Sequence, residues 1–74
     1  MAKYNGHKNY NHWSVYMAIN SEENFYNYAR ELTREIGPDR AAEQIADSMY
    51  DQKTVDGVPF TKTAVRAALR GILS

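Results

Sequence analysis

Residues 21–36 contain the feature that most constrains the fold of this chain, a run of apolar residues at α-helical spacing. The apolar positions follow one face of a 3.6-residue period: Phe25, Tyr28, Ala29, Leu32 and Ile36. Asn20 is the expected N-cap, and Glu23 completes a capping box with it. Gly37 suits the left-handed position after a helix, and Pro38 suits the first turn of the next one. The pattern predicts an amphipathic helix with defined ends that another helix follows directly.

Three other segments have helical patterns, at about residues 12–19, 38–51 and 61–73. Thr61 is the expected N-cap of the last helix, and Phe60 and Val65 form a hydrophobic staple around it. The segment 52–60 contains an Asp-Gly turn and is predicted to be an ordered loop, with a tiny hairpin as the alternative. We therefore expect a single all-α domain over residues 1–74, with three main helices and a short first one.

The composition argues against several classes of protein. A 74-residue chain without cysteine has to stabilise its fold without disulfides. Nine basic and nine acidic residues give no net charge, so the overall charge does not favour nucleic acid or a membrane surface as the partner. No apolar run approaches the ~20 residues that cross a bilayer. Met1 is not followed by the pattern of a targeting segment, so we expect no membrane association.

The residues that commonly carry chemistry do not form a recognisable site. His7 and His12 are five positions apart, which does not place them on one helix face, and no cysteine completes a metal site. The serines lack the glycine pattern of a nucleophile elbow. The four glycines are dispersed, so no phosphate-binding loop is expected. We therefore expect no metal, no cofactor and no enzymatic activity.

Charged residues form two stripes of opposite sign at helical spacing. The acidic stripe on the third helix contains Glu43, Asp47 and Asp51. The basic stripe on the fourth helix contains Lys62, Arg66 and Arg70. If the two helices are adjacent and antiparallel, the stripes face each other and form exposed ion pairs worth at most about 1 kcal/mol each, the explanation that we favour slightly. In the other explanation, one stripe binds an oppositely charged partner.

The last helix also has a resemblance of its own. Its sequence, TKTAVRAALRGIL, is similar to the recognition helix of winged-helix and related transcription regulators. The resemblance implies that hydroxyl and basic side chains contact DNA, namely Thr61, Lys62, Thr63, Arg66 and Arg70. Against it, about nine residues separate the third and fourth predicted helices, whereas a tight helix-turn-helix uses three or four, and no sequence remains for a wing. DNA binding is therefore the alternative function.

Aromatic residues are numerous for so short a chain. The arm at residues 1–12 contains aromatic rings but no acid, and we expect it to be ordered. Three aromatic residues are the expected structural anchors: Tyr10, Trp13 and Phe60. Another group forms a row on the predicted outer face of the second helix: Tyr26, Arg30 and Arg34. Because Tyr and Arg are enriched at binding hot spots, this row and the basic stripe are the candidate partner contacts.

The opening sequence, YNGHKNYNHWSVYMAIN, resembles that of a family of small, mostly uncharacterised accessory proteins of phages and plasmids. The residues that fit the pattern of this family are Tyr4, Asn5, Gly6, Lys8, Asn9, Tyr10, Trp13, Val15 and Ile19. His7 departs from the pattern, because an aromatic ring is usual at that position. The resemblance covers roughly the first quarter of the chain. It implies a small accessory protein that acts in a bacterial cytoplasm, and it implies no catalytic role.

These observations lead to an expected function. We expect a non-enzymatic phage or plasmid protein that binds a bacterial host protein complex and inhibits or redirects it, for example a CRISPR-Cas defence system or host transcription. The alternative is a small DNA-binding regulator that uses the fourth helix. A homodimer is compatible with both functions, with the small residues of the fourth helix packed against a copy: Ala64, Ala67 and Ala68.

Overall fold

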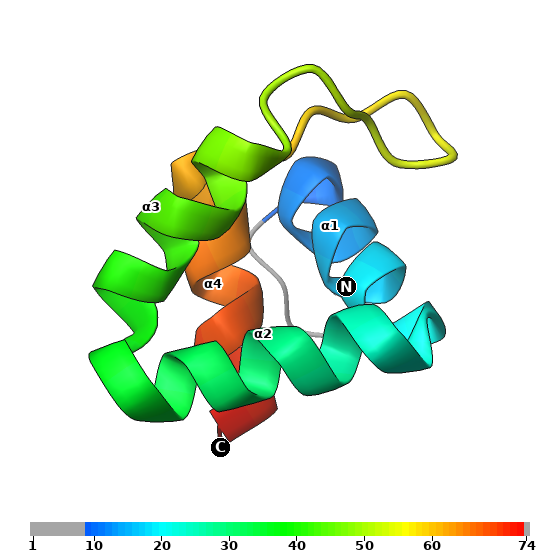
Figure 1. Ribbon diagram of the computed structural model, residues 1–74. Coiled ribbons are helices and arrows are strands. Elements are labelled where there is room, and N and C mark those ends of the chain that lie inside the picture. The colour runs from blue at the N-terminus through cyan, green and yellow to red at the C-terminus, as the bar shows by residue number, and fades with distance from the viewer. Residues whose placement is uncertain (1–8, 74) are drawn as a thin grey trace.

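The computed structural model describes residues 9–73, which form four α-helices and no strand (Figure 1). The helices are α1, Tyr10–Ser21; α2, Glu23–Ile36; α3, Pro38–Ser48; and α4, Lys62–Leu73. The all-α prediction is therefore confirmed for the described part of the chain. Residues 1–8 of the expected arm lie outside the described residues, so the prediction that this segment is ordered is not tested. Residues 10–12, also assigned to the arm, form the first turn of α1.

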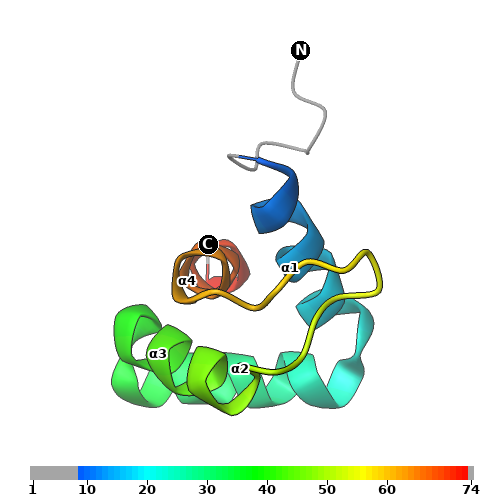
Figure 2. The same ribbon diagram turned by 90° about the horizontal axis from the view of Figure 1, so that it is seen from above.

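The helices are arranged around α4. α4 lies between α1 and α3 and packs against both, whereas α1 and α3 do not contact each other. α2 contacts each of the other three helices and runs beneath them in Figure 1. In Figure 2, α1 lies beside α4 and α3 lies below it, so the two helices pack against different sides of α4. The helix with the predicted basic stripe is therefore the central one.

The boundary between α1 and α2 differs from the prediction. The side-chain oxygen of Asn9 accepts a hydrogen bond from the His12 N–H at 2.9 Å, and this cap starts α1 earlier than expected. Asn20, the predicted N-cap of α2, lies inside α1, where its side chain donates to the Tyr16 carbonyl at 2.8 Å. Glu22 precedes α2 in an extended conformation and makes no side-chain cap bond. The predicted capping box is wrong because the Asn20 side chain bonds to the backbone of its own helix.

Gly37 is the single residue between α2 and α3. Its φ of 88° and ψ of 159° lie outside the predicted left-handed helical region, in a region that is accessible essentially to glycine alone. Its N–H donates to the Thr33 carbonyl, and its carbonyl accepts from the Ala41 N–H, both at 2.9 Å. Pro38 occupies the first turn of α3, as predicted. One glycine therefore ends α2 and begins α3.

Replacing Gly37 with L-alanine should lower the free energy of unfolding by about 1–3 kcal/mol, because the backbone would keep a conformation that L-residues avoid. Apart from residues 36–38 themselves, no heavy atom lies within 4 Å of the added methyl group, so a clash with the rest of the fold does not contribute. Urea unfolding followed by circular dichroism measures the change. D-alanine at position 37, introduced by chemical synthesis, is the matched control, because it adds the same atoms and favours positive φ. An equal loss of stability in both variants would contradict this explanation.

The connection from α3 to α4 begins earlier than predicted, because α3 ends at Ser48. The Ser48 hydroxyl and the Met49 N–H both donate to the Ile45 carbonyl, at 2.9 and 3.0 Å, and close the last turn. At the other end, the Thr61 hydroxyl oxygen accepts a hydrogen bond from the Ala64 N–H at 3.2 Å. The prediction that Thr61 caps the last helix is therefore confirmed.

Between these ends the chain folds back on itself in a very short hairpin. The Thr54 N–H donates to the Val58 carbonyl at 2.8 Å, and one antiparallel bridge joins Lys53 to Pro59. Gly57 has a φ of 83° in the turn, a conformation that suits glycine. The tiny hairpin, the alternative to a plain loop, is therefore the form that the structure has.

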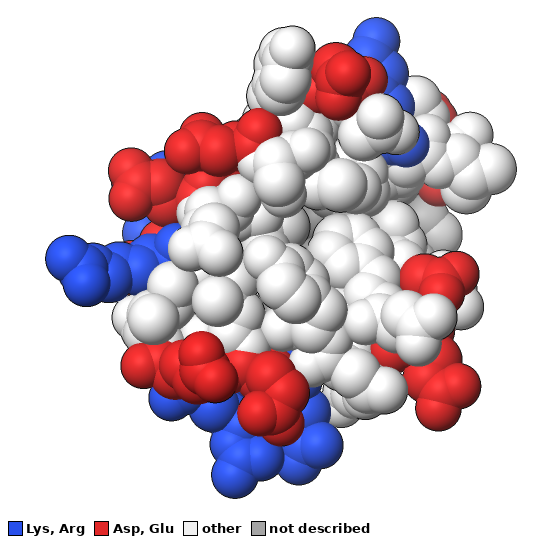
Figure 3. All heavy atoms as spheres, viewed as in Figure 1, with Lys and Arg blue, Asp and Glu red and all other residues white. Residues whose placement is uncertain are grey.

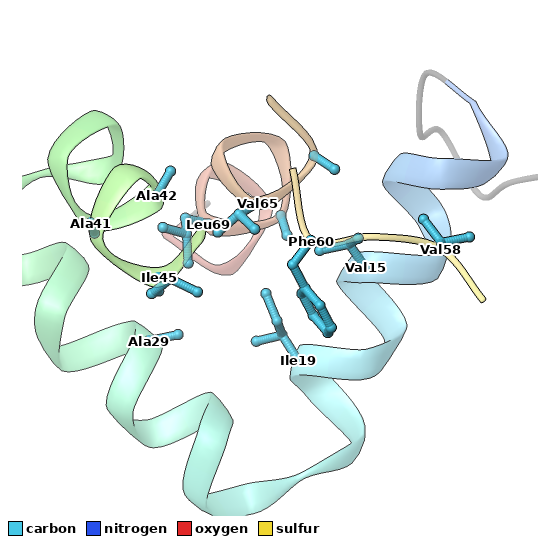
Figure 4. Close-up of a cluster of buried hydrophobic side chains, with 12 residues drawn as sticks. Val15, Ile19, Ala29, Ala41, Ala42, Ile45, Val58, Phe60, Val65 and Leu69 are labelled. Carbon is cyan, nitrogen blue, oxygen red and sulfur yellow. The ribbon is translucent and has the colours of Figure 1, made fainter. Parts of the chain in front are cut away.

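The core is one cluster of buried apolar side chains from all four helices and from the loop before α4 (Figure 4). Its large, fully buried apolar members are Val15, Ile19, Ile45, Val65 and Leu69. Phe60, the only expected anchor that lies in this cluster, enters it from the loop and lies near Ile19 in Figure 4. The Phe60 ring centroid is 6.1 Å from that of Phe25, so the loop and α2 meet through aromatic rings.

Tyr10 and Trp13, the other two expected anchors, lie outside the core cluster. Tyr10 is 39% exposed and Trp13 is half-buried, and their ring centroids are 5.8 Å apart. The Trp13 indole N–H is buried and has no hydrogen-bond partner among the described residues. Neither ring anchors the core, in contrast to the prediction, because helical geometry places both on the side of α1 opposite the buried Val15.

Candidate binding surface

The predicted basic stripe lies at the surface, on the outer side of α4. Lys62, Arg66 and Arg70 are all exposed, and we call these three residues the α4 face. The opposite side of α4 is buried in the core through four residues: Ala64, Val65, Ala68 and Leu69. Ala64 and Ala68 therefore pack inside the chain and are not available to a second copy, in contrast to the prediction, whereas Ala67 is half-buried.

Two residues of the α4 face pair with acidic residues of α3, as the favoured explanation of the stripes predicts. Lys62 Nζ lies 3.9 Å from Glu43 Oε2, and Arg66 Nε lies 2.8 Å from Asp39 Oδ1. The later basic residue on α4 pairs with the earlier acid on α3, so the two helices are antiparallel. Asp39 was not assigned to the acidic stripe, although it lies four residues before Glu43 and continues the same helical spacing by one turn.

The other members of the predicted acidic stripe, Asp47 and Asp51, form no ion pair with a described residue, and Asp51 lies beyond the end of α3. In the two pairs that do form, the four side chains are 45–70% exposed. Such exposed pairs are worth about 0–1 kcal/mol each. A partner that offers another anion to Lys62 or Arg66 therefore has little internal attraction to overcome.

A groove of about 350 Å³ lies between α4 and the first turn of α1. Its lining residues, which define what we call the basic groove, are His12, Thr63, Arg66, Ala67 and Arg70. No carboxylate is among these lining residues, and Arg70 makes no ion pair with a described residue. The guanidinium group presents N–H donors in a planar fork that fits a carboxylate or a phosphate. The groove can therefore hold an anionic group of a partner.

Sequence reasoning identified the two arginines of the basic groove but not His12 as one of its residues. His12 was assigned to the arm, whereas the cap at Asn9 starts α1 early enough to bring His12 beside α4. The signal that could have found it is the spacing of Asn9 and His12, because an N-cap side chain accepts from the N–H three residues later.

The predicted row on α2 is only partly exposed. Arg30 and Arg34 are exposed, but Tyr26 is half-buried, and Tyr28, which was predicted to face the core, is 47% exposed. Each helical residue turns the chain by about 100°, which places Tyr26 closer than Tyr28 to the direction of the fully buried Ala29. Neither Arg30 nor Arg34 lines the basic groove, so this groove does not join the α2 row to the α4 face.

A second hollow, of about 460 Å³, lies beside α3 and the end of α2 and is lined by Ile36, Arg40, Glu43, Gln44 and Asp47. It combines one basic and two acidic side chains, so it has no clear preference for one charge. Among the described residues, no three His, Asp or Glu side chains are placed to hold a metal ion, and His7 lies outside them. None of the described helices has the length and apolar character needed to cross a membrane.

A family comparison covers almost the whole chain. The family of unknown function DUF7249 matches residues 1–72. The chain belongs to this family. No curated protein and no solved structure matches it. Membership in DUF7249 assigns no activity, so the function of this member has to be argued from its surface.

Proposed function

We propose that this chain is a non-enzymatic binding protein that recognises an acidic segment of a partner protein through the α4 face and the basic groove. The partner that we propose is a bacterial host protein complex, for example a defence system or the transcription machinery. The chain, as a phage or plasmid accessory protein, would inhibit or redirect that complex in the host cytoplasm. Arg30 and Arg34 on α2 remain candidate contacts outside this surface.

The observation that carries the proposal is the basic groove. Arg66 and Arg70 lie one helical turn apart on its wall, and no carboxylate lines it. Arg is one of the residues most enriched at binding hot spots, and it forms bidentate hydrogen bonds with carboxylates. A groove of this size admits one or two side chains of a partner rather than a whole helix. An aspartate or glutamate side chain is therefore the group that we expect it to hold.

Acidic residues beside the groove favour a protein partner over a nucleic acid. Asp39 and Glu43 lie next to the α4 face on α3, and both would repel a DNA backbone. A protein partner can present an opposite charge to each sign of this mixed surface. The connection between α3 and α4, residues 49–61, is also longer than a helix-turn-helix uses.

One observation favours the DNA-binding alternative, namely that Lys62, Thr63, Arg66 and Arg70 all lie on the exposed side of one helix. If these residues contact phosphates, the affinity for duplex DNA falls steeply as the salt concentration rises, because each contact releases counterions. A titration of the chain with duplex DNA at several salt concentrations measures this slope. No binding to DNA at low salt would remove the alternative.

Charge reversal at Arg70 tests the proposed surface. Arg70→Glu should weaken binding of the captured host complex by about tenfold or more, because it places an acid where the partner presents one. Arg40→Glu is the matched control: it makes the same change at an exposed position of α3 that lines the other hollow, and it should leave binding within about twofold. Equal binding by the wild type and Arg70→Glu in a pull-down titration would refute the proposed surface.

A further inference from the structure

α1 differs from the other helices because none of its twelve residues is Lys, Arg, Asp or Glu. Its inner side is buried through Ser14, Val15 and Ile19. The opposite side carries Tyr10, Trp13, Met17 and Asn20, which we call the α1 face. A surface helix usually has charged or strongly polar residues opposite its buried stripe. Elsewhere on the surface, on the side of the molecule seen in Figure 3, charged side chains gather at the rim of a broad uncharged area.

The α1 face has the composition of a protein interface. Met17 is 44% exposed, Tyr10 is 39% exposed, and Trp13 is half-buried with its ring against Tyr10. Aromatic residues and methionine are enriched in protein interfaces, whereas charged residues are depleted from their centres. The absence of charge over a whole helix is therefore more informative than any single exposed residue.

We propose that the α1 face binds the α1 face of a second copy of this chain, with the two helices antiparallel. The four positions are symmetrical about Val15 in the sequence. Trp13 and Met17 are each two residues from it, and Tyr10 and Asn20 are each five residues from it. A two-fold axis therefore places Trp13 opposite Met17 of the second copy, and Tyr10 opposite Asn20 of the second copy. Methionine sulfur packs favourably against aromatic rings, so the central contact pairs well-matched groups.

Electrostatics on α1 favour a copy as the occupant. A two-fold axis brings each residue near the same region of its copy, so a charged face would meet its own charge, and this face has none. The antiparallel arrangement also places each positive helix end near a negative one. The helix is about 18 Å long, and this small area predicts a weak, concentration-dependent dimer rather than an obligate one. The α4 face takes no part in this contact, so the inference does not rest on the proposed function.

Sedimentation equilibrium of the full chain, from micromolar to millimolar concentration, tests the dimer. We expect the mass to rise from 8.5 kDa toward twice that value. Met17→Lys should weaken the association by more than about tenfold, because two ammonium groups would meet near the axis. Gln44→Lys adds the same charge at an exposed position of α3 and should leave the association unchanged. A monomeric mass over the whole concentration range would overturn the proposal. The occupant of the α1 face would then be the first residues of the chain or a different protein.

Disulfide cross-linking tests the antiparallel register, and the absence of native cysteine makes its result specific. An equimolar mixture of Tyr10→Cys and Asn20→Cys chains should form mixed disulfide dimers on mild oxidation, whereas each variant alone should form few. In the proposed register, a residue at either end lies about 15 Å along the axis from its own copy, too far for a disulfide. Efficient cross-linking of each variant with itself, or no cross-linking in the mixture, would overturn the register. This test does not depend on whether the Met17→Lys chain folds.

Discussion

Leu69→Ala is expected to lower the free energy of unfolding by about 2–5 kcal/mol, the largest effect of any single change that we propose. Leu69 is fully buried on α4, the helix that lies between α1 and α3. Truncation removes buried apolar surface and leaves a cavity among side chains that relax only partly. A 74-residue domain has a total stability of about 4–11 kcal/mol, so a large part of it would be lost. Urea unfolding with detection at 222 nm measures the difference.

Two valines offer a sharp comparison for this test, Val65 in α4 and Val55 in the loop between α3 and α4. Val65→Ala removes two methyl groups from a fully buried side chain, whereas Val55→Ala makes the same change at a loop residue that is 99% exposed. The first should be clearly destabilising, and the second should change the stability by less than about 0.5 kcal/mol. If Leu69→Ala and Val65→Ala were as mild as Val55→Ala, the described core would be wrong.

Thr54→Val is expected to cost about 1–3 kcal/mol, because it removes the centre of a buried hydrogen-bond network without changing the shape of the side chain. The Thr54 hydroxyl oxygen accepts from the N–H groups of Asp56 and Val58, both at 3.2 Å. Its oxygen lies 2.8 Å from the Ser14 hydroxyl oxygen, which donates to Asp56 Oδ2 at 3.2 Å. Thr54 is therefore the donor to Ser14, and every group in this network is satisfied. The network holds the hairpin against α1.

Thr63→Val is the matched control for Thr54→Val, since it replaces an exposed threonine and should change the stability by less than about 0.5 kcal/mol. Hydrogen exchange adds a local measurement. The Val58 amide should lose protection in Thr54→Val before the amides of α2 do, because its hydroxyl acceptor is gone. Unchanged stability and unchanged exchange would mean that the network does not hold the loop.

The elements that local rules determine were predicted well. The apolar period over residues 21–36, the Gly37-Pro38 boundary and the Thr61 cap each depend on residues close together in the sequence. The error at the boundary between α1 and α2 occurred where two local signals competed. Asn20 could cap the following helix or bond to its own, and the bond to the Tyr16 carbonyl prevails in the structure.

The candidate site was less predictable because it depends on the register between helices. The pairing of Arg66 with Asp39 depends on the position of α3 along the axis of α4. The periodicity of the apolar residues does not determine that position. The basic groove was also missed because the start of α1 was predicted too late in the sequence. The actual start places His12 beside α4. Periodicity predicted which side of α4 is basic, but only the packing of α1 turned that side into a groove.

The measurement that tests the central claim most directly is capture of bacterial host proteins by the tagged chain, with nuclease treatment, followed by mass spectrometry. Arg70→Glu and Arg40→Glu chains are captured in parallel. We predict one discrete protein complex that survives nuclease, is retained by Arg40→Glu and is lost with Arg70→Glu. Recovery of nucleic acid and nuclease-sensitive proteins alone would contradict the claim and make α4 a DNA-binding helix.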